Sequence, residues 1–294
     1  MRGFNLGYTF YRNNDRAEDV DFGREIVNRA EHLKVDASEY FEIEHSEKLV
    51  YSTVYPSLTL GLGYAHDTSE KDDYKLGFMF DHTTGLPYIP GSTLKGVLRS
   101  MFPFDEEDRE RLDFINDLLG ESYSYEKLYE IEKSIFGKKP KDSDTKDDAQ
   151  SKDIFYDGYF ETMEGGFLAS DNLTPHKDEI TSPIPLRFLK IAPETKLVLQ
   201  FELKENEKIG KTERMELYRG ILSWTGLGAK TNVGYGQLEE YDEEKSKILK
   251  QQAIEEQKEK KRKEEEKKAK AKAFRKTHSP FRKIQRVKKA DRKD

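Results

Sequence analysis

The 294-residue sequence contains no cysteine, a single tryptophan and no apolar run long enough to cross a membrane. The lack of cysteine excludes disulfide bridges, thiolate zinc sites and cysteine nucleophiles, and it fits either a reducing interior or a hot one. A membrane-spanning helix needs an apolar run of about 18 residues or more, and the N-terminus has no signal-peptide pattern. We therefore expect a cytoplasmic protein with no membrane partner.

The charge is unevenly distributed along the chain. Residues 239–294 hold 21 Lys and Arg against 13 Asp and Glu, a net charge of +8. Residues 1–238 hold 30 against 44, a net charge of −14. An acidic body argues against indiscriminate binding of nucleic acid. An RNA site would therefore be a local basic patch, or a partner would complete it.

Four glycines surround a lysine, a threonine and an asparagine in the segment GLGAKTNVGYG, residues 226–236. Glycine permits positive φ angles and close approach to the main chain. Successive N–H groups in such a loop can form an anion-binding nest, which a lysine reinforces. The phosphate of a ligand is therefore one candidate, and a tight helix-to-strand connection that binds nothing is the other. The candidate binding residues are Gly226, Gly228, Lys230, Thr231, Asn232, Gly234, Tyr235 and Gly236.

Nucleotide-binding motifs do not fit this segment. A Walker A loop requires G-x-x-x-x-G-K-[ST], but Ala229 precedes Lys230 and Trp224 stands at the first glycine position. The dinucleotide pattern G-x-G-x-x-G fails at Thr231. The backbone of a nucleic acid is therefore the preferred source of a bound phosphate, and Tyr235 is the preferred ring for stacking on a base.

A second candidate site lies in YIPGSTLKGVLRS, residues 88–100, where Ser92 is expected to begin a helix. A helix N-terminus attracts phosphate through its free N–H groups and its dipole. Gly96 is unfavourable inside a helix by about 1 kcal/mol relative to alanine, so we expect another backbone or a ligand to approach it closely. The alternative is an ordinary amphipathic helix with solvated charges. The candidate contacts are Gly91, Ser92, Lys95 and Arg99.

Hydrophobic periodicity predicts an α+β fold. The simplified order β, α, β-β, α, glycine-rich loop, β is that of the ferredoxin-like (RRM-like, split βαβ) arrangement, with insertions. Trp224 is expected to be buried at the end of its helix. We expect strands at residues 48–64, 154–162, 166–170, 185–191, 196–203 and 235–241, and helices at residues 16–34, 92–102, 105–136 and 211–224.

The composition predicts one domain over residues 1–241, with helical insertions and a polar loop at about residues 137–153. A charged extension, helical or disordered, follows over residues 242–294. From residue 267 onward it holds 13 basic and 2 acidic residues, so it is either a solubilising tail or a basic arm for RNA.

PYIPGSTLKGVLR, followed about 130 residues later by GLGAKTNVGYG, resembles the RAMP superfamily of CRISPR-associated RNA-binding proteins. The segments SIFG, FYDGYF, SDNLTPH and PIPLRFLKI lie between these motifs in the order typical of that family. The resemblance covers residues 1–241 and is greatest to the sixth subunits of the Cmr, or type III-B, effector complex. It implies a RAMP fold with the two motifs flanking a ferredoxin-like sheet.

The resemblance further implies a non-catalytic structural subunit of a ribonucleoprotein that targets foreign RNA. Its partners would be crRNA, near the 3′ end of the guide, target RNA and other RAMP subunits of the Cmr complex, with no cofactor and no metal. In that family the backbone subunit cleaves the target through an aspartate loop, and no position here matches that aspartate.

Three alternatives stay open at this point. The chain could be the terminal RAMP subunit of a type III-A (Csm) complex. It could instead be a repeat-processing endoribonuclease, with His82 or His176 as general acid or base. Asp157 and Asp171 would form a carboxylate pair for a metal only if their strands were adjacent.

Overall fold

The computed structural model describes residues 5–12, 22–33, 36–61, 78–137, 153–161, 166–173 and 186–249, with scattered positions from 251 to 270. The chain divides into two compact units, Met1–Asp242 and Glu243–Asp294. The predicted polar loop lies outside the described residues, except for its end positions 137 and 153. None of the described helices is long and apolar enough to span a bilayer.

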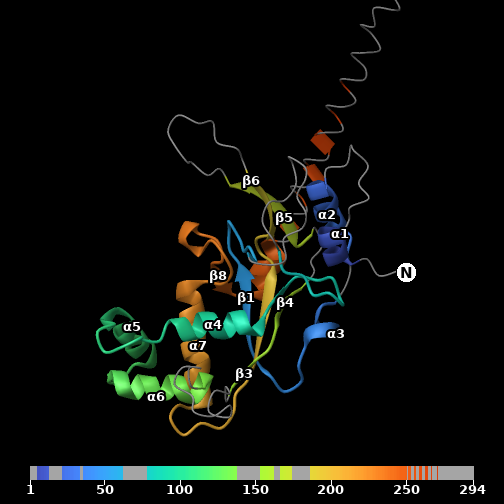
Figure 1. Ribbon diagram of the computed structural model, residues 1–294. Helices are drawn as coiled ribbons and strands as arrows, with labels where there is room; N and C mark the ends of the chain where they lie inside the picture. Colours follow the sequence, from blue (N-terminus) through green and yellow to red (C-terminus); the bar gives the residue numbers. More distant parts are fainter. Residues whose placement is uncertain are drawn as a thin grey trace, which may run out of the picture. The chain divides into compact units, whose positions relative to one another are not determined.

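The first unit is built on a six-stranded antiparallel sheet (Figure 1). The strand order is β2-β4-β7-β1-β8, and β3 pairs with β7 as well. The longest pairing joins β1 to β7, from Glu47 opposite Phe201 to Ser52 opposite Lys196. The strands are β1 (Glu47–Thr53), β2 (Tyr88–Ile89), β3 (Ile154–Phe155), β4 (Gly158–Phe160), β7 (Lys196–Glu202) and β8 (Leu238–Glu240).

Four strands and two helices reproduce the split βαβ order. Along the chain these elements are β1, α4 (Gly91–Ser100), β4, β7, α7 (Lys211–Thr225) and β8. In the sheet the four strands lie in the order β4-β7-β1-β8, and each is antiparallel to its neighbours. The predicted α+β, ferredoxin-like fold with helical insertions is therefore confirmed.

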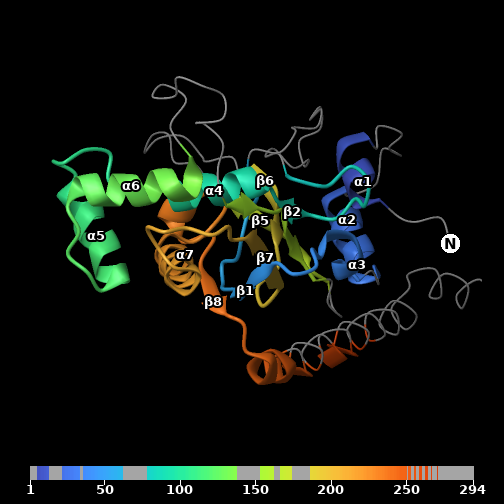
Figure 2. The ribbon, with the colours of Figure 1, turned by 90° about the horizontal axis from the view of Figure 1, so that it is seen from below.

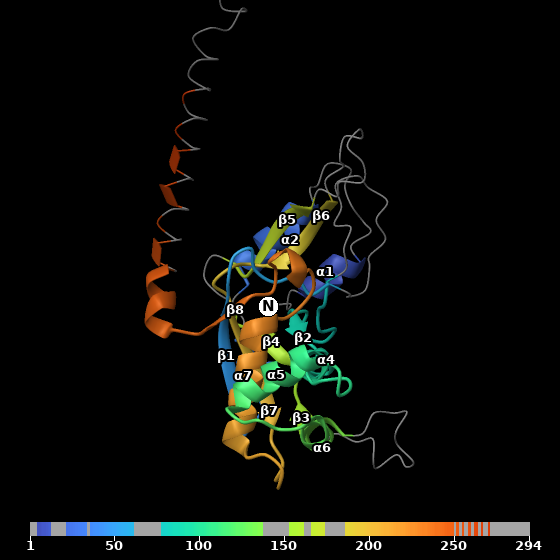
Figure 3. The same cartoon turned by 90° about the vertical axis from the view of Figure 1, so that its left-hand side faces the viewer.

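The helices lie on both sides of this sheet. Figure 2 shows α4 to α7 on one side and α1, α2 and α3 on the other. In Figure 3, α4 and α7 lie in front of the sheet, where they contact each other. The remaining helices are α1 (Leu6–Arg12), α2 (Phe22–Glu31), α3 (Ser38–Phe41), α5 (Arg109–Leu119) and α6 (Tyr125–Phe136).

A separate two-stranded sheet is inserted between β4 and β7. It consists of β5 (Leu168–Leu173) and β6 (Leu186–Ile191), which pair in antiparallel fashion from Leu168↔Ile191 to Leu173↔Leu186. β5 extends to Leu173, past the end at residue 170 that the sequence predicted for this strand. The cause is the continued pairing of Asp171 and Asn172 with β6.

A buried ion pair anchors α7. Arg214 and Asp153, each with 1% of its side chain exposed, meet with Nη1 2.5 Å from Oδ1 and 2.7 Å from Oδ2. The Tyr218 hydroxyl donates to Asp153 Oδ2 at 3.1 Å, and burial together with this carboxylate raises the pKa of Tyr218. The pair fixes α7 against the residue that precedes β3.

Trp224 is exposed, so the prediction that it is buried is wrong. Its side chain is 75% accessible, and the ring contacts Phe114 of α5 at 5.7 Å between centroids. The buried face of α7 carries Leu217, Ile221 and Leu222. Trp224 lies in the last helical turn at the edge of this face.

Candidate nucleic-acid interface

The glycine loop, residues 226–236, connects α7 to β8 and is fixed at both ends. At its start, Gly226 N donates to Leu222 O at 2.9 Å and ends the helix. The loop then closes on itself, because Leu227 N donates to Gly236 O at 2.8 Å. Ala229 N donates to Thr59 O at 2.9 Å, which joins the loop to the segment after β1.

Three of the four glycines are required by the packing of the loop itself. Gly226, Gly228 and Gly236 have φ angles of +66°, +93° and +83°. A Cβ atom at these positions would lie 2.1 to 2.6 Å from a backbone oxygen. Their small size therefore shapes the loop and leaves the ligand contacts to its tip.

The tip of the loop has the backbone geometry of an anion-binding nest. Lys230 adopts a left-handed conformation (φ 63°, ψ 29°), and the right-handed 3-10 turn Thr231–Val233 follows it. Such a sequence of conformations turns successive N–H groups toward one point. Among the described residues, no acceptor binds the backbone N–H groups of Lys230, Thr231 or Asn232. Thr231 and Asn232 are exposed, so an anion can reach these three donors.

The side chain of Tyr235 holds the base of the loop. Its hydroxyl donates to Asp171 Oδ2 at 2.7 Å, and its ring packs edge-on against Phe188 at 5.7 Å. Burial, followed by the hydrogen bond to Asp171, raises the pKa of Tyr235. The structure thus gives Tyr235 a positioning role at the loop, whereas its predicted stacking on a base stays a prediction.

Lys190 and Asp171 complete this anchor. Lys190 Nζ lies 2.6 Å from Asp171 Oδ2 and donates to Pro56 O at 2.9 Å. Burial opposes ionisation of Asp171, but the hydrogen bonds from Lys190, Tyr235 and Asn172 outweigh it and lower the pKa of Asp171. The pair therefore joins the two strands of the small sheet, Asp171 links that sheet to Tyr235 of the glycine loop, and Lys190 links it to Pro56.

The start of α4 already holds an anionic group of the protein. Gly91 N donates to Asp157 Oδ1 at 2.7 Å. A Cβ atom on Gly91 would lie 2.0 Å from Phe155 O, so the glycine allows β3 to approach. Asp157 therefore binds one N–H group at the helix start where the sequence predicted an RNA phosphate, while Ser92 is exposed beside it.

Lys95 and Arg99 differ in their freedom to bind RNA. Arg99 Nε lies 2.7 Å from Glu132 Oε1, and its Nη2 donates to Gly137 O at 2.9 Å, so it fastens α4 to α6. Partial burial, followed by the charge of Arg99, lowers the pKa of Lys95. The predicted approach of another backbone to Gly96 is wrong, because an added Cβ would meet nothing within 4 Å, whereas the approach of a ligand stays a prediction. Gly96 instead borders a hollow of about 220 Å³ beside Arg99.

The two candidate segments lie at opposite ends of the main sheet. Gly91 contacts Phe155, which pairs with Phe201 near the end of β7. The glycine loop lies near the other end of β7. There Thr53 N donates to Thr195 O, just before β7, and Val54 N donates to Gln237 O, just after the loop. Six residues of a strand span about 20 Å, so one phosphate cannot contact both segments.

The other candidate groups do not converge. Asp157 precedes β4 in the main sheet and Asp171 belongs to β5 in the small one, so the proposed carboxylate pair is not formed. Within the described parts of the chain, no three His, Asp or Glu side chains could hold a metal. His82 is exposed, with its ring 6.1 Å from that of Tyr11. His176 lies outside the described residues.

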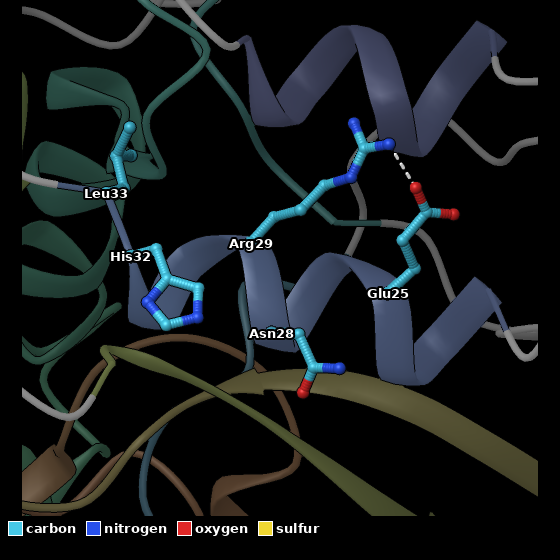
Figure 4. A pocket seen from close by; sticks show the side chains of 5 residues that line it. All are labelled: Glu25, Asn28, Arg29, His32 and Leu33. Carbon is cyan, nitrogen blue, oxygen red and sulfur yellow. Dashed lines mark ion pairs between the residues drawn. The ribbon is translucent and has the colours of Figure 1, made fainter.

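A hollow of about 330 Å³ along α2 is a further pocket (Figure 4). A single helix and the residues that follow it supply the described lining, and Arg29 forms an ion pair with Glu25 within that helix. This arrangement supplies no converging donors for a phosphate. The lining residues are Glu25, Asn28, Arg29, His32 and Leu33.

Comparison with known proteins relates this chain to one family. The family model described as RAMP superfamily matches residues 50–239, which include both candidate segments. The CRISPR system CMR subunit Cmr6 of Saccharolobus solfataricus is 30% identical over 168 residues. This alignment covers 55% of the present chain and 48% of the relative, so the chain matches about half of the relative's length.

Two solved structures are also similar. One is a chain of the cryo-EM structure of the type III-B Cmr-beta complex bound to cognate target RNA, with 26% identity and a TM-score of 0.44, covering 66% of this chain and 58% of that one. The other is the crystal structure of Cmr6 from Pyrococcus furiosus, with 20% identity and a TM-score of 0.43, covering 67% and 98%.

Proposed function

The chain belongs to the RAMP superfamily, and on that premise we propose that it is an RNA-binding structural subunit of a type III-B (Cmr) CRISPR effector complex. In this proposal it contacts the crRNA near the 3′ end of the guide and catalyses no reaction of its own. The similarity to a CMR subunit supports membership of such a complex. Other RAMP subunits and the target RNA would be its further partners.

The observation that carries RNA binding is the nest at Lys230–Asn232. Three adjacent N–H groups and one ammonium group suit a phosphate oxygen, because each donor supplies a directed or charge-assisted contact. These groups contact the sugar–phosphate backbone and not the base edges, so the site would bind RNA without regard to sequence. A subunit that holds guides of different sequence needs this property.

The acidic body limits how tightly the isolated chain can bind. Residues 1–238 carry a net charge of −14, which repels RNA everywhere except at a local basic site. Neighbouring subunits that bind the same strand would raise the effective concentration of RNA at the nest. We therefore expect weak binding by the isolated protein and much tighter binding in the assembled complex.

Lys230→Asn tests the site. Lys230 has a φ angle of +63°, and asparagine tolerates this left-handed conformation, so the exchange removes the charge with little strain. RNA affinity should fall to a similar extent for all sequences, and the slope of log affinity against log salt should flatten by about one unit. Lys208→Asn is the matched control, because Lys208 forms an ion pair with Glu130 on another surface.

Two outcomes would contradict the proposal. Unchanged RNA affinity and salt slope in Lys230→Asn would remove the nest as the RNA site. Cleavage of repeat-containing RNA by the purified protein, lost in a His82→Ala or His176→Ala variant, would favour the processing endoribonuclease. Purification from the host with crRNA and other RAMP subunits would support the proposed assembly.

A further inference from the structure

Tyr55 is a large exposed aromatic residue beside the glycine loop. Its side chain is 76% accessible, whereas Tyr51 and Tyr159 in the adjoining sheet are buried. It lies in the turn that follows β1, next to Pro56. An exposed ring of this size offers a flat apolar face, which proteins that bind single strands use to stack bases.

The backbone around Tyr55 is fixed to the glycine loop. Val54 N donates to Gln237 O at 3.2 Å, and Gly236 N donates to Ser57 O at 2.8 Å. A Cβ atom built on Gly234 would lie 3.9 Å from Cδ of Pro56, so the turn and the loop are in contact. Tyr55 and the nest therefore belong to two segments that are in direct contact.

Lys190 orients the Tyr55 ring. Its ammonium group lies 5.6 Å from the Tyr55 ring centroid and 5.7 Å from that of Tyr235. Only 7% of the Lys190 side chain is exposed, so this buried cation contacts the Tyr55 ring from the protein side, while 76% of Tyr55 stays accessible. A ring held in place by a cation–π contact loses less side-chain entropy when a ligand stacks on it.

We propose that the exposed ring of Tyr55 stacks on an unpaired base of the RNA strand whose phosphate binds the nest at Lys230–Asn232. This inference rests on the proposed function and adds a base contact to it. The group that stacks on Tyr55 is a nucleobase, because the N–H groups of the adjacent nest select a phosphate. One nucleotide carries both a base and a phosphate. Stacking tolerates any base, so the contact keeps the site independent of guide sequence.

The test uses the full-length protein and two single-stranded RNA ligands of equal length. One carries all its bases, and the other is abasic at every internal position but keeps every phosphate. Tyr55→Ala should weaken binding of the complete RNA by roughly 5- to 100-fold and leave binding of the abasic RNA unchanged. Tyr55→Phe should bind both ligands like the parent, because the ring is retained.

Tyr40→Ala is the matched control, since Tyr40 of α3 is another tyrosine with 60% exposure. Photo-crosslinking of the complete RNA to the parent protein, followed by peptide mapping, should identify the peptide that contains Tyr55. Equal affinities of the parent and Tyr55→Ala for the complete RNA, with crosslinks elsewhere, would overturn this inference and leave the proposed function standing. Failure of the parent to bind either ligand would overturn the proposed function as well.

Discussion

Asp171 connects three segments at the base of the glycine loop. It accepts hydrogen bonds from Lys190 of β6, from Tyr235 of the loop and from the N–H of its neighbour Asn172. These contacts all favour the carboxylate over the protonated acid. The loop is therefore positioned by a charge that can be titrated in acid.

We predict that Asp171 contributes to stability at neutral pH and that part of the loss of stability in acid comes from its protonation. Because its pKa is lowered in the folded protein, its contribution is complete above the unfolded value of about 3.9 and is lost as the pH falls through the folded pKa. Asp171→Asn should therefore be less stable than the parent at neutral pH, and the difference should shrink below about pH 4. Denaturant unfolding of both proteins, measured from neutral pH to below pH 4, tests this prediction. Asp113→Asn, at an exposed position on α5, is the control. A difference that is constant with pH would contradict the assignment.

Asp157 has a different role, as a capping group supplied by a distant segment. Loss of a side chain that accepts from the first N–H groups of a helix costs about 1 kcal/mol. Asp157→Ala should lower the free energy of unfolding by this amount. Asp157→Asn should lose only a few tenths of a kcal/mol, because the amide oxygen can still accept from Gly91 N. Equal losses in the two variants would show that the charge, and not the hydrogen bond, stabilises α4.

At the scale of elements, two glycines in the two candidate segments should respond oppositely to the same substitution. Gly236→Ala places a Cβ 2.1 Å from Leu227 O at a φ angle of +83° and should cost at least about 2 kcal/mol. Gly96→Ala adds a methyl group to open space inside α4 and should stabilise by up to about 1 kcal/mol. Urea unfolding of both variants measures the difference. Destabilisation by Gly96→Ala would indicate a close neighbour that the structure does not show.

The sequence predicted β1, β3, β4, β7 and β8 of the main sheet, and helix α7, because apolar residues gather within each of these segments, whereas the two-residue strand β2 was missed. β7 is buried from Leu197 to Phe201, and α7 buries Leu217, Tyr218, Ile221 and Leu222 on one face. The glycine loop was also visible in the sequence, since its positive φ angles restrict the residue type. Local sequence pattern was therefore enough to predict the order of these elements along the chain and the position of the glycine loop.

Contacts between distant residues could not be predicted in the same way. Asp157 lies 66 positions from Gly91, and Glu132 lies 33 positions from Arg99. A pattern of single residue types does not reveal which carboxylate will reach which donor. For this reason the sequence marked the start of α4 as a phosphate site, whereas the fold places an aspartate there. Tyr55 was missed because its exposure depends on the turn beside the loop.

At the scale of the whole molecule, the two units carry opposite charge. Residues 1–242 hold 30 Lys and Arg against 47 Asp and Glu, and residues 243–294 hold 21 against 10. The positive charge is concentrated after residue 266, where 13 basic residues stand with 2 acidic ones. Between residues 243 and 266, by contrast, lysines pair with glutamates, as Lys247 does with Glu243 and Lys263 with Glu259.

This distribution predicts that the basic charges after residue 266 add to RNA binding, whereas those before it do not. Replacing the 13 later Lys and Arg by glutamine should weaken RNA binding and flatten its salt dependence by about 0.7 for each RNA phosphate that is no longer neutralised. The control replaces the eight Lys and Arg from 245 to 263 by glutamine. It should change the salt slope less, because neighbouring glutamates already offset these charges. If the parent and the first variant show equal slopes of log affinity against log salt, only the unit Met1–Asp242 contacts the RNA.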